Sequence, residues 1–190
     1  EVAVYADETA VPSFVAADLL SQAEHGPDSQ VILVGSSESV VFRIQEALTS
    51  QLSKLPRKEM AEKALKNSNT IIVKDEQQAI DLLNEYAAEH LILSCENAEV
   101  VADKIINAGS IFIGNYSPES VGDYASGTNH TLPTNGYAKA YSGVSVDSFV
   151  KKITYQQLSK EGLANIGRTV ELMAAAEGLE GHAAAVRVRK

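Results

Sequence analysis

Four histidines and the carboxylates near them are the side chains of this sequence best suited to proton transfer or metal binding. They are His25, His90, His130 and His182. A neutral imidazole ligates divalent metals and titrates near neutral pH, so each is a candidate for either role. The single cysteine, Cys95, excludes a thiolate-rich structural zinc site and is better explained as a small buried residue.

The most compact of these groups is the pair Glu89-His90, which lies between a predicted helix and a predicted strand. An adjacent carboxylate and imidazole suit general acid–base chemistry, because the imidazole moves a proton near pH 7 and the carboxylate activates water. A polar turn between the two elements explains the same residues equally well.

A second group lies near the end of the first predicted helix. Gln22 and His25 are three residues apart and therefore share a helix face, with Asp18 one turn earlier on the same side. The alternative is a solvated helix end whose histidine satisfies the last carbonyl groups.

The third group lies in Gly114–Asn135, a long segment that follows neither the helical nor the strand period. It is rich in Gly, Ser, Thr, Asn and Pro, and it contains Asp123 and His130. Compact domains rarely contain so long a connection unless it binds something or is disordered. The segment keeps four large apolar residues and has little net charge, which disfavours disorder. A set of Asx turns is the other explanation.

The last histidine, His182, follows Glu177 by five residues in a glycine-containing tail. A histidine isolated in a tail is usually a solvated side chain.

Alternating strands and helices must position these groups. The predicted strands are Val2–Tyr5, Val31–Val34, Thr70–Val73, Leu91–Leu93 and Ser110–Ile113. The predicted helices are Ser13–His25, a helix from Ser37 or Glu38 to Leu52, Arg57–Lys66, Glu76–Ala88 and Ala98–Asn107. The near-continuous apolar strands are typical of a parallel sheet covered on both faces. The sequence therefore predicts an α/β domain, a layered αβα structure with a mostly parallel sheet.

The pattern changes after the long segment. We expect a helical turn at Asp147–Lys151, a strand at Ile153–Gln157 and an alanine-rich helix at Glu161–Glu177. We therefore expect residues 1–140 to form the α/β domain and residues 141–190 to form a small, mainly helical extension that packs on another subunit.

The composition of the 190 residues limits the partners. An apolar fraction of 45% with 22% charged residues is typical of a globular protein with a substantial core. The net charge of −9, with no basic cluster, argues against a nucleic-acid partner, and no apolar run approaches the length of a membrane span. One cysteine fits a reducing compartment, so we expect a cytoplasmic protein. The chain begins directly in a predicted strand, and we expect further residues upstream.

Five stretches together resemble the histidinol dehydrogenase family. They are Asp7-Glu-Thr-Ala, Ala16-Ala-Asp-Leu-Leu-Ser-Gln-Ala-Glu-His25, Ala88-Glu-His-Leu91, the long run from Gly109-Ser-Ile-Phe-Ile-Gly to Gly127-Thr-Asn-His130, and Ser142-Gly-Val-Ser-Val146. The resemblance covers essentially the whole chain in order, and the long run is the most specific part of it.

The resemblance implies a zinc- and NAD-dependent oxidoreductase that takes L-histidinol through the aldehyde to L-histidine, the last step of histidine biosynthesis. It also implies an architecture related to the aldehyde dehydrogenases. Its implied zinc ligands are Gln22, His25, Asp123 and His182, and its implied acid–base residues are Glu89 and His90. Substrate would be held by the four zinc ligands, His90, His130 and Glu177. A zinc site with nitrogen and oxygen ligands and room for substrate is catalytic in character.

Members of the family are more than twice as long as this chain. The resemblance implies that the missing upstream part makes most NAD contacts, and that the tail with Glu177 and His182 crosses to the other protomer of a homodimer. We therefore expect this chain to be a C-terminal portion that does not turn over histidinol alone.

Two other functions fit the same residues. One is a zinc- or small-molecule-binding module that has lost catalysis. The other is a relative of the aldehyde dehydrogenases that uses Cys95 as its nucleophile.

Overall fold

A computed structural model describes all residues 1–190 and divides them into two compact units. Unit 1 is Glu1–Phe149 and unit 2 is Val150–Lys190. No helix of either unit is both long and apolar enough to cross a membrane.

Unit 1 is built on a five-stranded parallel sheet in the order β3-β2-β1-β4-β5. The strands are β1 (Val2–Ala6), β2 (Val31–Gly35), β3 (Asn69–Ile72), β4 (His90–Ser94) and β5 (Ser110–Ile113). Every residue of β1, β2 and β4 is buried, as the apolar runs predict for strands covered on both faces. The predicted α/β fold with a mostly parallel sheet is confirmed.

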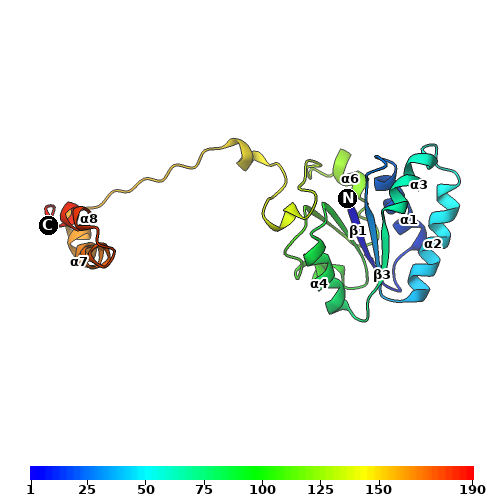
Figure 1. Cartoon of the computed structure of the whole chain (residues 1–190), viewed down its shortest axis with the longest axis horizontal. Helices are drawn as coiled ribbons and strands as arrows, with labels where there is room; N and C mark the ends of the chain where they lie inside the picture. Colours follow the sequence, from blue (N-terminus) through cyan, green and yellow to red (C-terminus); the bar gives the residue numbers. More distant parts are fainter. The chain divides into compact units, whose positions relative to one another are not determined.

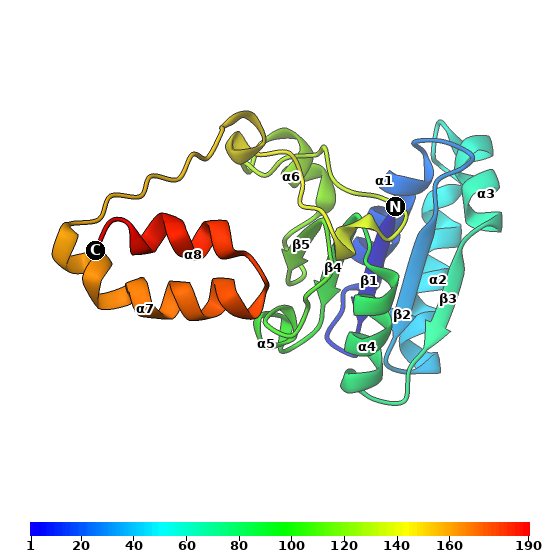
Figure 2. The same cartoon turned by 60° about the vertical axis from the view of Figure 1, so that its left-hand side comes forward.

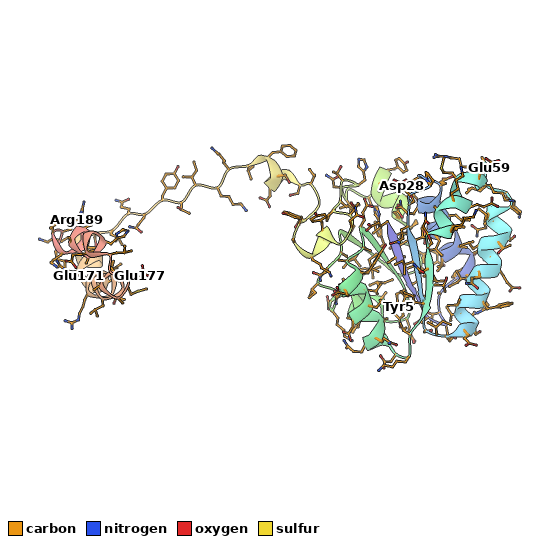
Figure 3. All side chains as sticks on the ribbon, in the orientation of Figure 1. Tyr5, Asp28, Glu59, Glu171, Glu177 and Arg189 are labelled. Carbon is orange, nitrogen blue, oxygen red and sulfur yellow. The ribbon has the colours of Figure 1, made fainter.

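Helices cover both faces of this sheet (Figure 1). The first face carries α1 (Pro12–Ala23), α2 (Glu38–Leu52) and α3 (Lys58–Lys66), and the second carries α4 (Glu76–Tyr86) and α5 (Ala98–Ala102). Because alternate residues of a strand point to opposite faces, β1 sends Val2 and Val4 into the first core and Ala3 and Tyr5 into the second. Tyr5 is labelled in Figure 3.

Local signals set where several helices begin. Pro12 occupies the first helical turn of α1, where its missing N–H is not needed. Ser37 and Asp75 cap α2 and α4 by accepting hydrogen bonds from the backbone of Val40 and Gln78.

Two predictions within unit 1 differ from the structure. The helix predicted over Ala98–Asn107 ends at Ala102, because the side chain of Asn84 captures the backbone N–H groups of Ile106 and Asn107. The long segment predicted to lack regular structure contains α6 (Glu119–Tyr124), a helix too short to show an apolar period. The 3-10 turn η1 (Tyr137–Lys139) follows just beyond the predicted bounds of the segment.

The boundary between the units falls after Phe149 rather than after residue 140. Two hydrogen bonds hold the intervening residues to unit 1, one from Val144 N–H to the Thr131 carbonyl and one from the Asn129 side chain to the Val144 carbonyl. The 3-10 turn η2 (Val146–Phe149) ends the unit.

Unit 2 is a helical hairpin of α7 (Lys160–Ala176) and α8 (Glu180–Arg187), which lie side by side in Figure 2. Its buried residues are small: Gly167, Ala174 and Ala183. The strand predicted at Ile153–Gln157 pairs with no strand of the chain and lies in the extended stretch before α7.

Candidate functional site

His90 is the first residue of β4 and lies at the amino edge of the sheet with only 4% of its surface exposed. Its Nδ1 atom is 3.0 Å from the backbone carbonyl oxygen of Glu1. A carbonyl oxygen can only accept, so Nδ1 carries the proton and donates it. The other ring nitrogen, Nε2, is then an unprotonated acceptor, and it is buried without a hydrogen-bond partner. An unprotonated ring nitrogen without a hydrogen-bond partner can act as a general base.

Three carboxylates surround this imidazole. Oxygens of Glu89 and Glu119 each lie 3.9 Å from Nδ1, and an oxygen of Asp123 lies 3.9 Å from Nε2. Burial lowers the pKa of His90 from its ordinary value, while the hydrogen bond to Glu1 and the charges of Glu89 and Asp123 act in the opposite direction. The balance keeps the ring neutral at pH 7, the state in which it can accept a proton.

Glu119, the first residue of α6, was missed by the sequence reasoning. It is 2% exposed, and one of its carboxylate oxygens, Oε2, has no hydrogen-bond partner. Burial, aided by the charge of Asp123, raises the pKa of Glu119 to about 8. One sequence signal points to it: Glu119 and Asp123 are four residues apart and share a face once a helix is assigned there.

The loop between α4 and β4 positions Glu89. Ala87 ends α4 in the left-handed conformation with φ 54°, although it is not a glycine. Across from it, a Cβ at Gly109 would come within 2.5 Å of the Glu89 carbonyl oxygen, so only glycine fits beside that backbone. The backbone nitrogen of Glu1 donates to the Glu89 carboxylate at 2.7 Å.

Gln22 and His25 come together at the end of α1, as their spacing predicts. Gln22 Nε2 is 3.4 Å from His25 Nδ1, and Gln22 Oε1 is buried without a hydrogen-bond partner. His25 itself is exposed. One turn earlier, burial raises the pKa of Asp18 to about 7. Helix α1 contacts α6, and the charge of Asp18 in turn helps to raise the pKa of Glu119.

The long segment places its two predicted residues, Asp123 and His130, in different surroundings. Gly122 allows α6 to lie against Phe112, since a Cβ there would come within 2.6 Å of the phenylalanine ring. This packing sets Asp123 beside His90. His130 is exposed and has no hydrogen-bond partner.

Three of the zinc ligands that the resemblance implies, Gln22, His25 and Asp123, lie in unit 1. No three His, Cys, Asp or Glu side chains converge on one point that could hold a metal ion. The proposed set contains only two such residues in unit 1, His25 and Asp123, because its third donor is a glutamine and its fourth belongs to unit 2. The unpartnered oxygen of Gln22 beside His25 agrees with this donor set.

The remaining two candidates lie in unit 2. Glu177 is the exposed C-cap residue of α7 and is labelled in Figure 3, and His182 is an exposed residue in the first turn of α8. They are five residues apart across the turn that joins the two helices.

Cys95 lies at the opposite, carboxyl edge of the sheet, directly after β4. Its side chain is 7% exposed, and burial raises the pKa of its thiol to about 12. Since the thiolate is the nucleophile, this position does not suit nucleophilic catalysis.

Comparison with known proteins identifies relatives along the full chain. The family model described as histidinol dehydrogenase matches residues 1–190. A histidinol dehydrogenase of Bacteroides thetaiotaomicron is 59% identical over 189 residues, which are 100% of this chain and 44% of the relative. A chloroplastic histidinol dehydrogenase of Arabidopsis thaliana is 56% identical over 190 residues, which are 41% of its length.

A crystal structure of histidinol dehydrogenase from Elizabethkingia anophelis has the same fold, with a TM-score of 0.94 and 57% sequence identity. The match covers 99% of this chain and 43% of that one. This chain thus spans less than half the length of the relatives that it matches.

Proposed function

The chain belongs to the histidinol dehydrogenase family, and on that premise we propose that it is the portion of the enzyme that carries the zinc ligands and the acid–base residues. The proposed reaction is the NAD-linked oxidation of L-histidinol through the aldehyde to L-histidine, the last step of histidine biosynthesis. The upstream length, present in the relatives, would make most of the contacts with NAD.

The state of His90 is the single observation that carries this proposal. Its Nδ1–H donates to a backbone carbonyl, which leaves Nε2 buried, unprotonated and without a partner. In the proposed reaction Nε2 takes the hydroxyl proton of the alcohol while hydride leaves the same carbon. After it has released this proton to water, Nε2 takes a hydroxyl proton of the hydrated aldehyde while a second hydride passes to NAD.

Glu89 is the proposed base for that hydration. Its side chain is 15% exposed, so a water molecule can reach it, and its carboxylate lies beside the imidazole. A carboxylate in this position takes a proton from water as the water attacks the aldehyde carbon.

Gln22, His25, Asp123 and His182 are the proposed zinc ligands. Zinc bound there would hold the imidazole and amine of histidinol and so fix the reacting carbon. His130 and Glu177 are proposed to hold the substrate together with the four ligands and His90. Because Glu177 and His182 lie in unit 2, we propose a homodimer whose active sites are completed by the partner's unit 2. A cytoplasmic location remains our proposal from the single cysteine.

The test compares Glu89→Gln and His90→Gln with wild type in a protein that joins this chain to the upstream length of its relatives. We expect turnover to fall by roughly 10²- to 10⁴-fold, the usual contribution of a general base, with one zinc per site retained. Cys95→Ala is the matched control and keeps full activity. Loss of activity in the control would favour a cysteine nucleophile, and unchanged activity in the Glu89 and His90 variants would favour a binding module without catalysis.

The isolated chain tests the division of labour between the two parts. We expect no NAD reduction with histidinol, because most contacts with NAD are proposed to lie upstream. Reduction of NAD by this polypeptide alone would overturn that part of the proposal.

A further inference from the structure

Phe112 of β5 lies beside His90 on the same face of the sheet. The register pairs Phe112 with Ile92, which follows His90 by two residues, so the three side chains point to the first face. The centroids of the Phe112 and His90 rings are 6.0 Å apart, and the two ring planes make an angle of 34°. At this separation the two rings form an aromatic pair, so the phenylalanine restricts the orientation of the imidazole.

The same phenylalanine supports the backbone of α6. A Cβ at Gly122 would come within 2.6 Å of Cε1 and 3.0 Å of Cζ of Phe112, so the helix lies directly on the outer end of the ring. Phe112 is only 8% exposed, and Gly122 is buried. So close an approach of backbone to ring requires glycine, because any side chain would push the helix away.

Helix α6 buries no large apolar side chain of its own. Its buried residues are Glu119 and Gly122, whereas Val121 and Tyr124 are 47% and 87% exposed. The hydroxyl of Thr128 donates a hydrogen bond of 3.0 Å to the carbonyl of the same Gly122. The contact between Gly122 and the phenylalanine ring is therefore the main apolar support of this short helix.

The position of α6 matters because it carries two of the three carboxylates around His90. Oxygens of Glu119 and Asp123 lie 3.9 Å from Nδ1 and Nε2 of the imidazole, respectively. Gly122 is part of the backbone between these two carboxylates. One phenylalanine ring thus contacts both the imidazole and the helix that faces it.

We propose that Phe112 is a positioning residue for the oxidation of histidinol: its ring orients the imidazole of His90 and, through Gly122, sets the distance from that imidazole to Asp123. The inference rests on the proposed function and adds to it a residue that acts through His90 and α6. Phe112 and Gly122 are matched in size. A shorter side chain at 112 leaves a space under α6, and a longer one at 122 pushes α6 away.

Steady-state kinetics in the protein that joins this chain to the upstream length of its relatives tests the proposal. Phe112→Leu removes the ε and ζ carbons of the ring but stays apolar. We expect kcat to fall by roughly 10- to 100-fold, since a misplacement of about 1 Å has an effect of this order. With zinc at saturation, KM for histidinol should change by less than about threefold, because the contact acts on the transition state.

The matched control is Ile44→Val. It removes volume from the same buried cluster but lies on α2, so it reports the effect of core packing alone. We expect kcat of this variant to stay within about twofold of wild type. A positioning role of Phe112 therefore appears as a fall in kcat that the control does not share.

The matched sizes of Phe112 and Gly122 allow a sharper test. Gly122→Ala places a methyl group against the end of the ring, and we expect kcat to fall by roughly 10-fold or more. In the double variant with Phe112→Leu, that methyl group enters the space that the ring has left. The double variant should therefore exceed Gly122→Ala in kcat by roughly fivefold or more, whereas Ile44→Val in the same background gives no recovery.

Nuclear magnetic resonance of the 190-residue chain tests the ring contact without zinc, NAD or histidinol. In histidine-labelled protein, His90→Gln identifies the signals of His90 among those of the four histidines. Because a neighbouring aromatic ring shifts the signals of protons near it, Phe112→Leu should move the carbon-bound ring protons of His90. Ile44→Val should leave them in place.

Three results would overturn the inference in an enzyme that oxidises histidinol. They are a kcat for Phe112→Leu no lower than that of Ile44→Val, a double variant no more active than Gly122→Ala, and His90 signals that Phe112→Leu leaves unmoved. Phe112→Met, which keeps more of the side-chain volume, replaces Phe112→Leu throughout if thermal unfolding shows that the leucine variant does not fold. A wild-type joined protein that does not oxidise histidinol would instead overturn the proposed function, and the resonance comparison would still decide whether the ring contacts His90.

Discussion

The polar side chains at the two ends of the parallel strands in unit 1, the carboxyl edge and the amino edge of the sheet, differ in whether they have hydrogen-bond partners. At the carboxyl edge, Asp7 accepts hydrogen bonds from the backbone and hydroxyl of Thr9 and from the backbone of Glu96, at 2.8, 2.6 and 2.9 Å. At the amino edge, Gln22 Oε1, His90 Nε2 and Glu119 Oε2 are all buried without partners.

Ligands of open α/β sheets usually bind outside the carboxyl ends of the strands, where the strand order reverses. In this sheet that position lies between β1 and β4, where Asp7 joins the loops that follow the two strands. The difference teaches that satisfied polar groups fix the fold, whereas unsatisfied ones mark where a ligand is expected.

Among the variants that test this difference between the two edges, the largest expected effect is on zinc affinity. We expect His25→Ala at the amino edge to weaken zinc binding by at least about 100-fold, because loss of outer-shell partners alone already costs 10- to 100-fold. The midpoint of thermal unfolding of the metal-free chain should change little, since His25 is exposed. Zinc titration by calorimetry and thermal unfolding in a chelator check the two halves, and equal zinc affinity in the variant would remove His25 from the ligand set.

The converse change is Asp7→Ala at the carboxyl edge. It leaves the backbone N–H groups of Thr9 and Glu96 without their acceptor, so we expect a loss of about 2 to 3 kcal/mol in the free energy of unfolding. Zinc affinity should stay the same. Urea unfolding measures the stability, with Glu96→Ala as a control that keeps its backbone donor; a stable Asp7→Ala variant with weakened zinc binding would reverse the roles of the edges.

A smaller effect concerns pH. Because the pKa of Glu119 is raised from 4.5 to about 8, the folded state holds its proton over a range in which the unfolded state has lost it. Stability from this group is therefore complete below about pH 4.5 and is lost as pH rises toward 8. In metal-free protein, the free energy of unfolding of Glu119→Gln should fall by about 1 to 2 kcal/mol less than that of wild type between pH 5 and 8, since glutamine does not titrate. The expected difference is this small because the neighbouring carboxylates titrate together with Glu119. Urea unfolding at several pH values checks this, and parallel curves would show that Glu119 is ionised in both states.

Sequence predicts those parts of the molecule whose causes are local. The runs Val2–Tyr5 and Leu91–Leu93 predict central strands because both faces are buried, and adjacency alone brings Glu89 and His90 together. The sequence did not predict Glu119 as a site residue, because its importance comes from residues distant in sequence that pack around it. The sequence did not predict where α5 ends for the same reason, since Asn84 of another helix terminates it.

Predictions that depend on a partner behave differently. The apolar alternation around Ile153 and Tyr155 is typical of a strand, yet a strand needs a neighbour, and the single chain offers none to this segment. The pattern thus describes a requirement for a neighbouring strand that the residues of this chain do not meet.

The left-handed Ala87 restricts which mutations the neighbourhood of Glu89 and His90 tolerates. Its φ of 54° disfavours branched and bulky side chains, and its complete burial leaves no space for the asparagine or aspartate that otherwise adopt this conformation. Alanine and glycine are the only residues that meet both conditions. In a saturation-mutagenesis library, position 87 would therefore tolerate only alanine and glycine, although its side chain is a single methyl group with no chemistry of its own.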